Sequence, residues 1–158
     1  MAQERTLDRT DFQILRLLQE NARLSVKEIA SDIGLAASST HERIKKLWDD
    51  GVLLGAHAEV DPTAFGADLE ALLMIGFSKH KRSNVDKFLS EVTEISEVRS
   101  AILVTGRYDV IVHVLVRNTT HLKDLAFDQF TSRPGVTRIE TSIIYEHRKC
   151  YVTPLLAE

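Results

Sequence analysis

Apolar side chains in the first third of the chain recur at the spacing of an amphipathic helix, three times in succession. They return every three or four residues over 8–20 and again over 26–33, which places them on one face of each helix. Ser25 and Glu28 form a capping box before the second helix, and Gly34 ends it. A third helix is predicted over residues 37–51.

The third helix has two different faces. Its apolar side carries Ala37, Ile44, Leu47 and Trp48. Its polar side and flanks carry Ser38, Ser39, Glu42, Arg43, Lys45 and Lys46. A helix, a tight glycine turn and a second helix with a polar, partly basic face is the helix-turn-helix arrangement. The core expected for these three helices is Leu15, Leu18, Ile29, Ile33, Leu35, Ile44, Leu47 and Trp48.

The rest of the chain alternates strand and helix patterns. An extended segment over 52–60 ends in a turn at Asp61-Pro62. Strands are predicted over 69–78, 98–104, 110–116 and 136–146, and helices over 84–94 and 119–132. The order βαββαβ predicts an α+β fold of the ferredoxin-like type, with both helices on one face of an antiparallel sheet. We therefore expect a helix-turn-helix domain over 1–54, a linker over 55–66 and a ferredoxin-like domain over 67–158.

The helices of that plan leave one face of the sheet bare. Along the strand over 110–116, the valines share one face, while Ile111, His113 and Leu115 share the other, so both faces are largely apolar. A bare apolar sheet of this size is typical of a chain that pairs with a second copy in a two-fold dimer. His113 is accordingly interpreted as an interface histidine.

Composition narrows the class of protein. The 158 residues have a net charge of −3, and residues 1–55 hold eight Lys/Arg against nine Asp/Glu, so any contact with DNA must rest on a local patch. The polar N-terminus, the lack of a long apolar run and a single cysteine, Cys150, predict a cytoplasmic location and no contact with membranes. His113, His121 and His147 have no metal-site spacing, and no catalytic residue or cofactor is expected.

Three stretches in this order resemble the Lrp/AsnC (feast/famine) transcriptional regulators of bacteria and archaea. They are "LDRTDFQILRLLQENARLSVKEIASDIGLAASSTHERIKKLWDDGVLLGAHAEVDP", "LVTGRYDVIVHVLV" and "RPGVTRIETSIIYE". The resemblance implies a homodimer that presents two helices to a roughly palindromic site in double-stranded DNA. It also implies an amino-acid effector bound near the second and third strands, and dimers that assemble to tetramers or octamers.

The predicted DNA contacts lie on the third helix. Ser38, Ser39 and Arg43 are near its N-terminus, from which side chains reach base edges, and Arg43 is the expected guanine reader. Lys45 and Lys46 are expected to bind phosphate. The competing interpretation is a solvated surface helix. His41 is open to two interpretations, a base contact or support at the edge of the core.

The N-terminus of the same helix departs from the family. Relatives commonly have a serine at the position of Ala36, where it caps the helix, and alanine lacks a capping oxygen. Ser39 and Glu42 have the spacing of a capping box, which predicts a helix that begins one turn later.

The predicted effector site is the loop "TGRYD". Gly106 permits a tight turn, while Arg107 and Asp109 offer partners for the carboxylate and the ammonium of an α-amino acid. The alternative is a hairpin turn in which these two side chains pair with each other or with solvent. The resemblance adds further positions to the pocket, namely Leu103, Thr105, Tyr108, Thr141 and Ser142.

Two other functions remain open. Sirohaem decarboxylases resemble the same two-domain plan, so an enzyme of that kind is one alternative. An amino-acid sensor that no longer binds DNA is the other, because Ala36 departs from the family and the charge is not basic. The polar and basic third helix favours a DNA-binding regulator over both.

Overall fold

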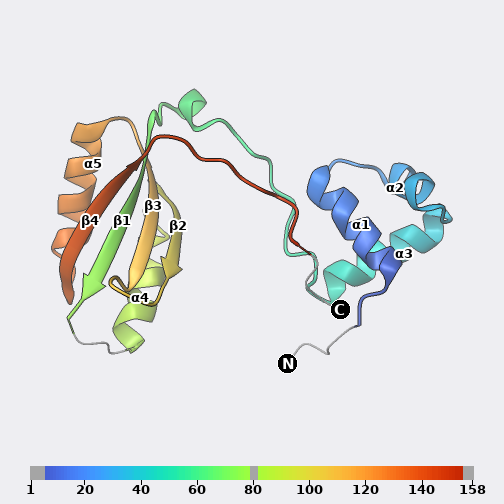
Figure 1. The fold of residues 1–158 in the computed structure, drawn as a ribbon, viewed down its shortest axis with the longest axis horizontal. Helices are drawn as coiled ribbons and strands as arrows, with labels where there is room; N and C mark the ends of the chain where they lie inside the picture. The colour runs from blue at the N-terminus through green and yellow to red at the C-terminus, as the bar shows by residue number, and fades with distance from the viewer. Residues whose placement is uncertain (1–5, 79–81, 155–158) are drawn as a thin grey trace. The chain divides into compact units, whose positions relative to one another are not determined.

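The computed structural model describes residues 6–78 and 82–154 and divides them between two compact units. One unit is Met1–Ala58 together with Arg148–Glu158, and the other is Glu59–His147 (Figure 1). The C-terminal segment therefore belongs with the first unit, whereas the sequence placed it in the second. It is held there in part by the Thr153 amide, which donates a hydrogen bond to the Gln19 side chain at 2.7 Å.

The first unit consists of three helices. They are α1 (Arg9–Glu20), α2 (Val26–Ile33) and α3 (Ala37–Asp49). Capping boxes begin α1 at Asp8 and α2 at Ser25, and Gly34 ends α2 with a φ of 68°, a left-handed conformation that glycine adopts without strain. The helices predicted from periodicity are confirmed.

The start of α3 differs from the prediction. The helix begins at Ala37, so the later start at a Ser39–Glu42 box is wrong, and its N-cap residue Ala36 makes no side-chain cap hydrogen bond. The first turn forms without one, and Thr40 adds a side-chain hydrogen bond within it. The Thr40 side chain is fully buried, and its hydroxyl donates to the Ala36 carbonyl at 3.1 Å.

Three fully buried or nearly buried side chains form the centre of this unit, Ile14, Ile29 and Leu47. Two expected core residues lie at the surface instead, since Leu35 is 38% exposed and Trp48 is 43% exposed. Thr40 lies seven residues before Leu47 and therefore shares its helix face. This position explains why a polar side chain is buried in the unit.

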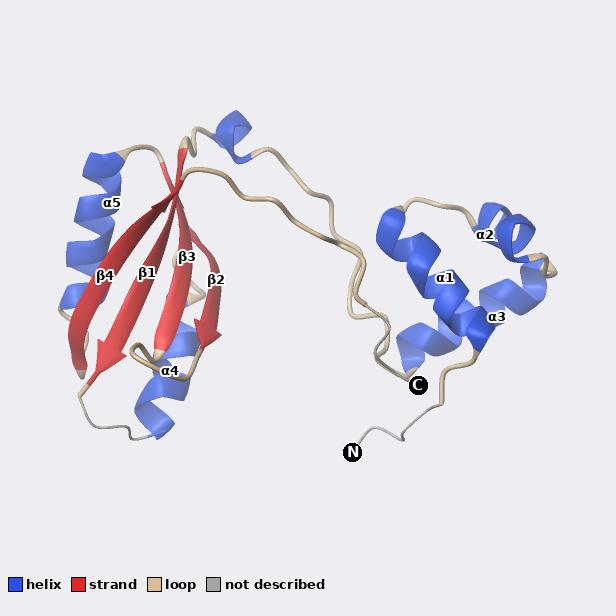
Figure 2. Cartoon of the chain, viewed as in Figure 1, coloured by secondary structure: helices blue, strands red, loops and turns tan. Residues whose placement is uncertain are grey.

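The second unit has the predicted βαββαβ order. Its elements are β1 (Leu69–Phe77), α4 (Arg82–Val92), β2 (Val98–Leu103), β3 (Val110–Val116), α5 (Thr119–Leu125) and β4 (Val136–Ile144), preceded by a 3-10 turn at Pro62–Phe65. The strands form one antiparallel sheet in the order β2-β3-β1-β4 (Figure 2). The last predicted helix is not uniform, because α5 passes into a π-helical segment at Ala126–Thr131.

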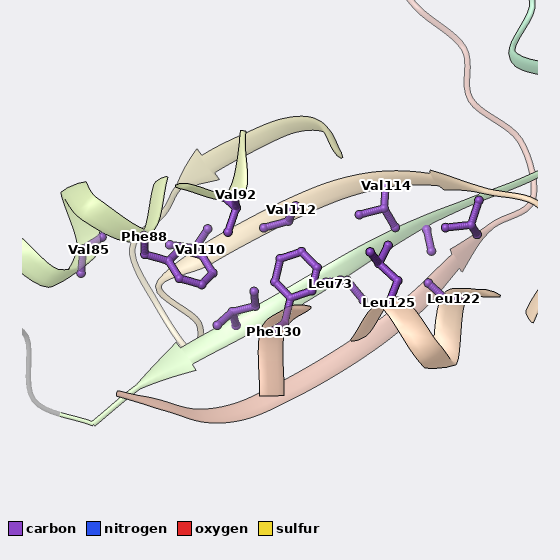
Figure 3. Close-up of a cluster of buried hydrophobic side chains, with 13 residues drawn as sticks. Leu73, Val85, Phe88, Val92, Val110, Val112, Val114, Leu122, Leu125 and Phe130 are labelled. Carbon is purple, nitrogen blue, oxygen red and sulfur yellow. The ribbon is translucent and has the colours of Figure 1, made fainter. Parts of the chain in front are cut away.

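One face of the sheet packs against both helices. Alternate residues of β1 and β3, among them Leu73, Val112 and Val114, meet Phe88 of α4 and Phe130 of the π segment (Figure 3). The opposite face carries apolar side chains that this core does not cover, namely Leu72, Met74, Ile102, Ile111, Leu115 and Ile144. The bare apolar face expected from sequence is therefore present. No helix in the described part of the chain is long and apolar enough to cross a bilayer.

Candidate functional site

The polar face of α3 is open to solvent. Ser38, Ser39, Lys45 and Lys46 are all exposed, and so is His41. The helix follows α2 through the left-handed turn at Gly34, which sets the arrangement of a helix-turn-helix unit. Because its N-cap residue supplies no hydrogen bond from a side chain, the first backbone N–H groups of α3 remain available to an acceptor from outside, such as a phosphate.

Arg43 differs from these residues because its guanidinium is held by α1. Nη1 donates to the carboxylate of Asp8 at 2.7 Å and to that of Asp11 at 2.9 Å. Asp11 is almost completely buried, with 2% of its side chain exposed, whereas 34% of the Arg43 side chain is exposed. The predicted guanine reader thus ties the capped end of α1 to the middle of α3.

The same contacts shift the pKa values of Asp8 and Arg43. The Asp11 backbone N–H and then the Arg43 guanidinium hold the pKa of Asp8 below its usual value. The two carboxylates in turn raise the pKa of Arg43, with Asp8 contributing most. Arginine is protonated at all physiological pH values, so the effect is on the strength of the contact and not on charge.

A surface hollow of about 660 Å³ lies beside this network. Three basic and four acidic side chains border it, together with Thr6: Arg43, Lys45, Lys46, Asp8, Asp11, Glu42 and Asp49. The charges nearly balance, so the hollow itself does not favour an anion. Contact with DNA then depends on the exposed ends of the lysines and on the first turn of α3.

The loop between β2 and β3 is fixed to the end of β1 by Asp109. Its backbone N–H donates to the Ile75 carbonyl at 2.9 Å, and its carboxylate accepts the Phe77 N–H at 2.8 Å. Gly106 has a φ of 123°, a conformation available to glycine, and a Cβ added there meets nothing within 4 Å. The glycine is therefore needed for its backbone conformation and not for space.

Arg107 and Tyr108 face residues of β4 instead of Asp109. Nη2 of Arg107 lies 3.9 Å from the Glu140 carboxylate, and the Tyr108 hydroxyl donates to the same carboxylate. This contact with an acceptor is the main reason that the pKa of Tyr108 is raised. The guanidinium of Arg107 lies 5.4 Å from the centre of the Tyr108 ring, and that of Arg138 lies 5.9 Å from it. The alternative pairing of Arg107 with Asp109 is absent from the described contacts.

The remaining predicted effector residues do not converge on one point. Thr141 pairs with Leu73 and Ser142 with Leu72, so the two side chains lie on opposite faces of the sheet. Ser142 shares the open face with Glu140. Leu103, at the end of β2, is 58% exposed, and Thr105 is exposed in the loop.

Sequence reasoning missed the acidic residues that contact Arg43 and Arg107. Asp8 and Asp11 precede Arg43 by 35 and 32 residues, and Glu140 follows Tyr108 by 32, so no local spacing connects them. A weak signal existed on β4, where Arg138 and Glu140 alternate as charged residues on one face of a predicted strand.

Comparison with known proteins assigns both units. Residues 7–53 match the winged helix-turn-helix DNA-binding family, and residues 70–153 match the Lrp/AsnC ligand binding domain. The transcriptional regulator FL11 of Pyrococcus abyssi is 35% identical over 144 residues, covering 91% of this chain and 93% of its own length. The transcriptional activator DecR of Escherichia coli is 32% identical over 152 residues, covering 96% and 99%.

A solved structure agrees over the same length. The complex of a transcriptional regulator from Neisseria meningitidis with L-Met has a TM-score of 0.87, with 28% identity over 96% of this chain and 97% of the other. The family matches and these relatives assign the chain to regulation of transcription. The chain belongs to the Lrp/AsnC family of DNA-binding transcriptional regulators.

Proposed function

We propose that α3 enters the major groove and that Ser38, Ser39, Lys45 and Lys46 make the contacts with DNA. The observation that carries this proposal is the exposure of these side chains on the helix that follows the glycine turn. The serines lie in the first turn, next to base edges, while the lysines hold phosphate. A dimer would place two such helices in successive grooves of a roughly palindromic operator.

Arg43 takes a different role in this proposal. Swinging it out to a guanine would gain about 1–3 kcal/mol for a bidentate contact. The movement would also remove the guanidinium from the buried Asp11 carboxylate, and loss of a charged hydrogen bond costs about the same. The two contributions are of similar size, so Arg43 positions α3 and offsets one of the two negative charges of Asp8 and Asp11, which would otherwise repel the DNA backbone.

The loop between β2 and β3 is proposed to bind the effector, an α-amino acid. Arg107 is the partner for its carboxylate, because 70% of that side chain is exposed and its contact with Glu140 is long. Glu140 replaces Asp109 as the partner for the ammonium, since Asp109 already holds the loop through Phe77. The L-Met complex of the Neisseria meningitidis regulator supports this class of ligand.

The effector is proposed to act by linkage. It changes DNA binding only if it binds one assembly, dimer or higher oligomer, more tightly than another. The bare apolar face of the sheet supports pairing of two copies.

Light scattering after size exclusion tests both halves of the proposal. The full chain is run with each of the twenty amino acids in turn, alone and with DNA from upstream of its own gene. We expect one amino acid to shift the mass and to change the retention of DNA. DNA binding with no response to any amino acid would overturn the effector site, and failure to bind any DNA fragment would overturn the role of α3.

The effector half has a matched pair of variants. Arg107→Ala removes the proposed carboxylate partner, and Arg99→Ala removes an exposed arginine of β2 in the same unit. We expect calorimetric affinity for the amino acid to fall by about tenfold or more in the first and to stay unchanged in the second. Equal affinities in the two variants would place the effector elsewhere.

A further inference from the structure

Two histidines and a glutamate from separate elements converge on the open face of the sheet. His113 Nε2 lies 2.9 Å from Glu70 Oε2, and His147 Nδ1 lies 3.6 Å from the same oxygen. One ligand atom from each of the three residues lies within 4.8 Å of the others. None of the three belongs to α3 or to the loop between β2 and β3.

The fold brings these residues together by strand register. Glu70 pairs with Leu115, and Leu72 pairs with His113. Glu70 and His113 are therefore diagonal neighbours on one face of the sheet. Glu70 also pairs with Ile144 at the end of β4, and His147 follows that strand three residues later. The cluster therefore joins the start of β1 and the middle of β3 to the segment that leaves β4.

The distances fit a transition-metal ion. Ligands bound at about 2.0–2.2 Å in tetrahedral geometry lie about 3.3–3.6 Å apart. The separation of His147 from the glutamate oxygen lies at the upper end of that range, and that of His113 lies below it. The His113 side chain is 12% exposed and lies in the strand, while that of His147 is 41% exposed in the segment after β4.

His121 and Glu97 of the same unit form a histidine–carboxylate hydrogen bond without a further ligand candidate in the part of the chain that the structure describes, and they serve as a comparison. His121 Nε2 lies 3.1 Å from Glu97, with no second imidazole or thiol grouped with it among the described residues. The Glu70 cluster has a second imidazole on the same carboxylate oxygen, with ring centres 5.8 Å apart. Convergence of two imidazoles and one carboxylate is the donor set of a mononuclear zinc site with an open position.

We propose that Glu70, His113 and His147 bind a divalent transition-metal ion of the Zn²⁺ type, with water in the remaining coordination position. Sequence analysis found no metal-site spacing because the three residues are widely separated along the chain and lie on β1, on β3 and after β4. The ion would fasten the segment after β4 to the sheet.

Calorimetric titration of the untagged full chain with ZnCl₂ tests the site. We expect one ion per chain and no comparable binding of Mg²⁺, which prefers oxygen ligands. Co²⁺ in place of Zn²⁺ reports the geometry through its visible absorption. His147→Ala and Glu70→Gln should each weaken binding by about tenfold or more, since changes merely next to ligands cost that much.

His121→Ala is the matched control, because it removes a histidine bonded to a carboxylate of the same unit. It should bind Zn²⁺ as the wild type does, with circular dichroism confirming the fold of each variant. Absence of Zn²⁺ binding by the wild type would overturn the proposal. So would equal affinity in His147→Ala, Glu70→Gln and His121→Ala.

Discussion

Arg43 in the helical unit and Arg107 in the sheet unit are both arginines that the sequence assigned to a ligand, yet the structure holds them very differently. Arg43 makes two charged hydrogen bonds, at 2.7 and 2.9 Å, and one of its partners is buried. Arg107 makes a long ion pair, at 3.9 Å, with a half-exposed glutamate, and its own side chain is 70% exposed.

The difference shows how prior contacts decide what an arginine can bind. A guanidinium that already satisfies a buried carboxylate must leave that group behind to reach a ligand, and the loss offsets the new contact. An exposed ion pair is worth little, so its arginine turns to a better partner at small cost. The same residue type therefore positions a helix in one unit and is available to a ligand in the other.

The largest expected effect is on the stability of the helical unit. Arg43→Ala should lower its free energy of unfolding by about 1–3 kcal/mol, because the Asp11 carboxylate stays buried without its guanidinium. Trp48, the single tryptophan, lies on α3 and reports this transition by fluorescence in urea. Lys46→Ala, on the exposed side of the same helix, is the control and should leave the midpoint unchanged.

The opposite outcome would restore the interpretation from sequence. If Arg43→Ala keeps the wild-type urea midpoint but loses discrimination between operator and unrelated DNA, Arg43 reads a base. The positioning role of Arg43, and with it the contrast to Arg107, would then be wrong.

The next effect concerns the lysines of α3. Changing Lys45 and Lys46 together to glutamine should weaken DNA binding by about tenfold at low salt, on operator and unrelated sequences alike. The slope of log affinity against log salt should become shallower by about 3.6 for a dimer, the value for four phosphate contacts, two from each copy. A slope identical to the wild type, measured by fluorescence anisotropy across a salt series, would remove the lysines from the interface.

The elements of both units were predictable because their signals are local. The capping box at Ser25 and the periodicity of apolar residues are signals within a single helix. The alternation along β3 is a signal within a single strand. The burial of Thr40 was not predictable, since a threonine in a polar stretch carries no signal that its side chain packs inside the folded unit.

The location of the candidate sites was predictable from the sequence, but the side chains that are available in them were not. Sequence reasoning chose α3 and the "TGRYD" loop, but it assigned Asp109 to a ligand, whereas the folded chain uses that carboxylate for the Phe77 amide. The partner of Arg107 comes from β4, and strand pairing alone brings it near. Contacts between distant segments decide which polar groups remain available, and periodicity carries no information about them.

A smaller effect is expected at the anchor of the loop. Asp109→Ala leaves the Phe77 amide without the side chain that accepts its hydrogen bond, at a cost of about 1 kcal/mol. Hydrogen exchange at that amide, followed by NMR, should become faster by about fivefold. Asp124→Ala removes an exposed aspartate of α5 and serves as the control. Unchanged exchange at Phe77 in both variants would return Asp109 to the set of ligand-binding candidates.

The smallest expected effect completes the comparison. Arg107→Ala should change the free energy of unfolding by less than about 0.5 kcal/mol, because its side chain is exposed and its contact with Glu140 is long. Urea unfolding followed by circular dichroism measures this change under the conditions used for Arg43→Ala. A loss as large as that of Arg43→Ala would mean that Arg107 also holds its unit together, and the contrast between a positioning arginine and an available one would disappear. If the variant is stable but no longer binds the amino acid, Arg107 contributes to binding and not to folding. That is the result expected for a guanidinium that is available to a ligand.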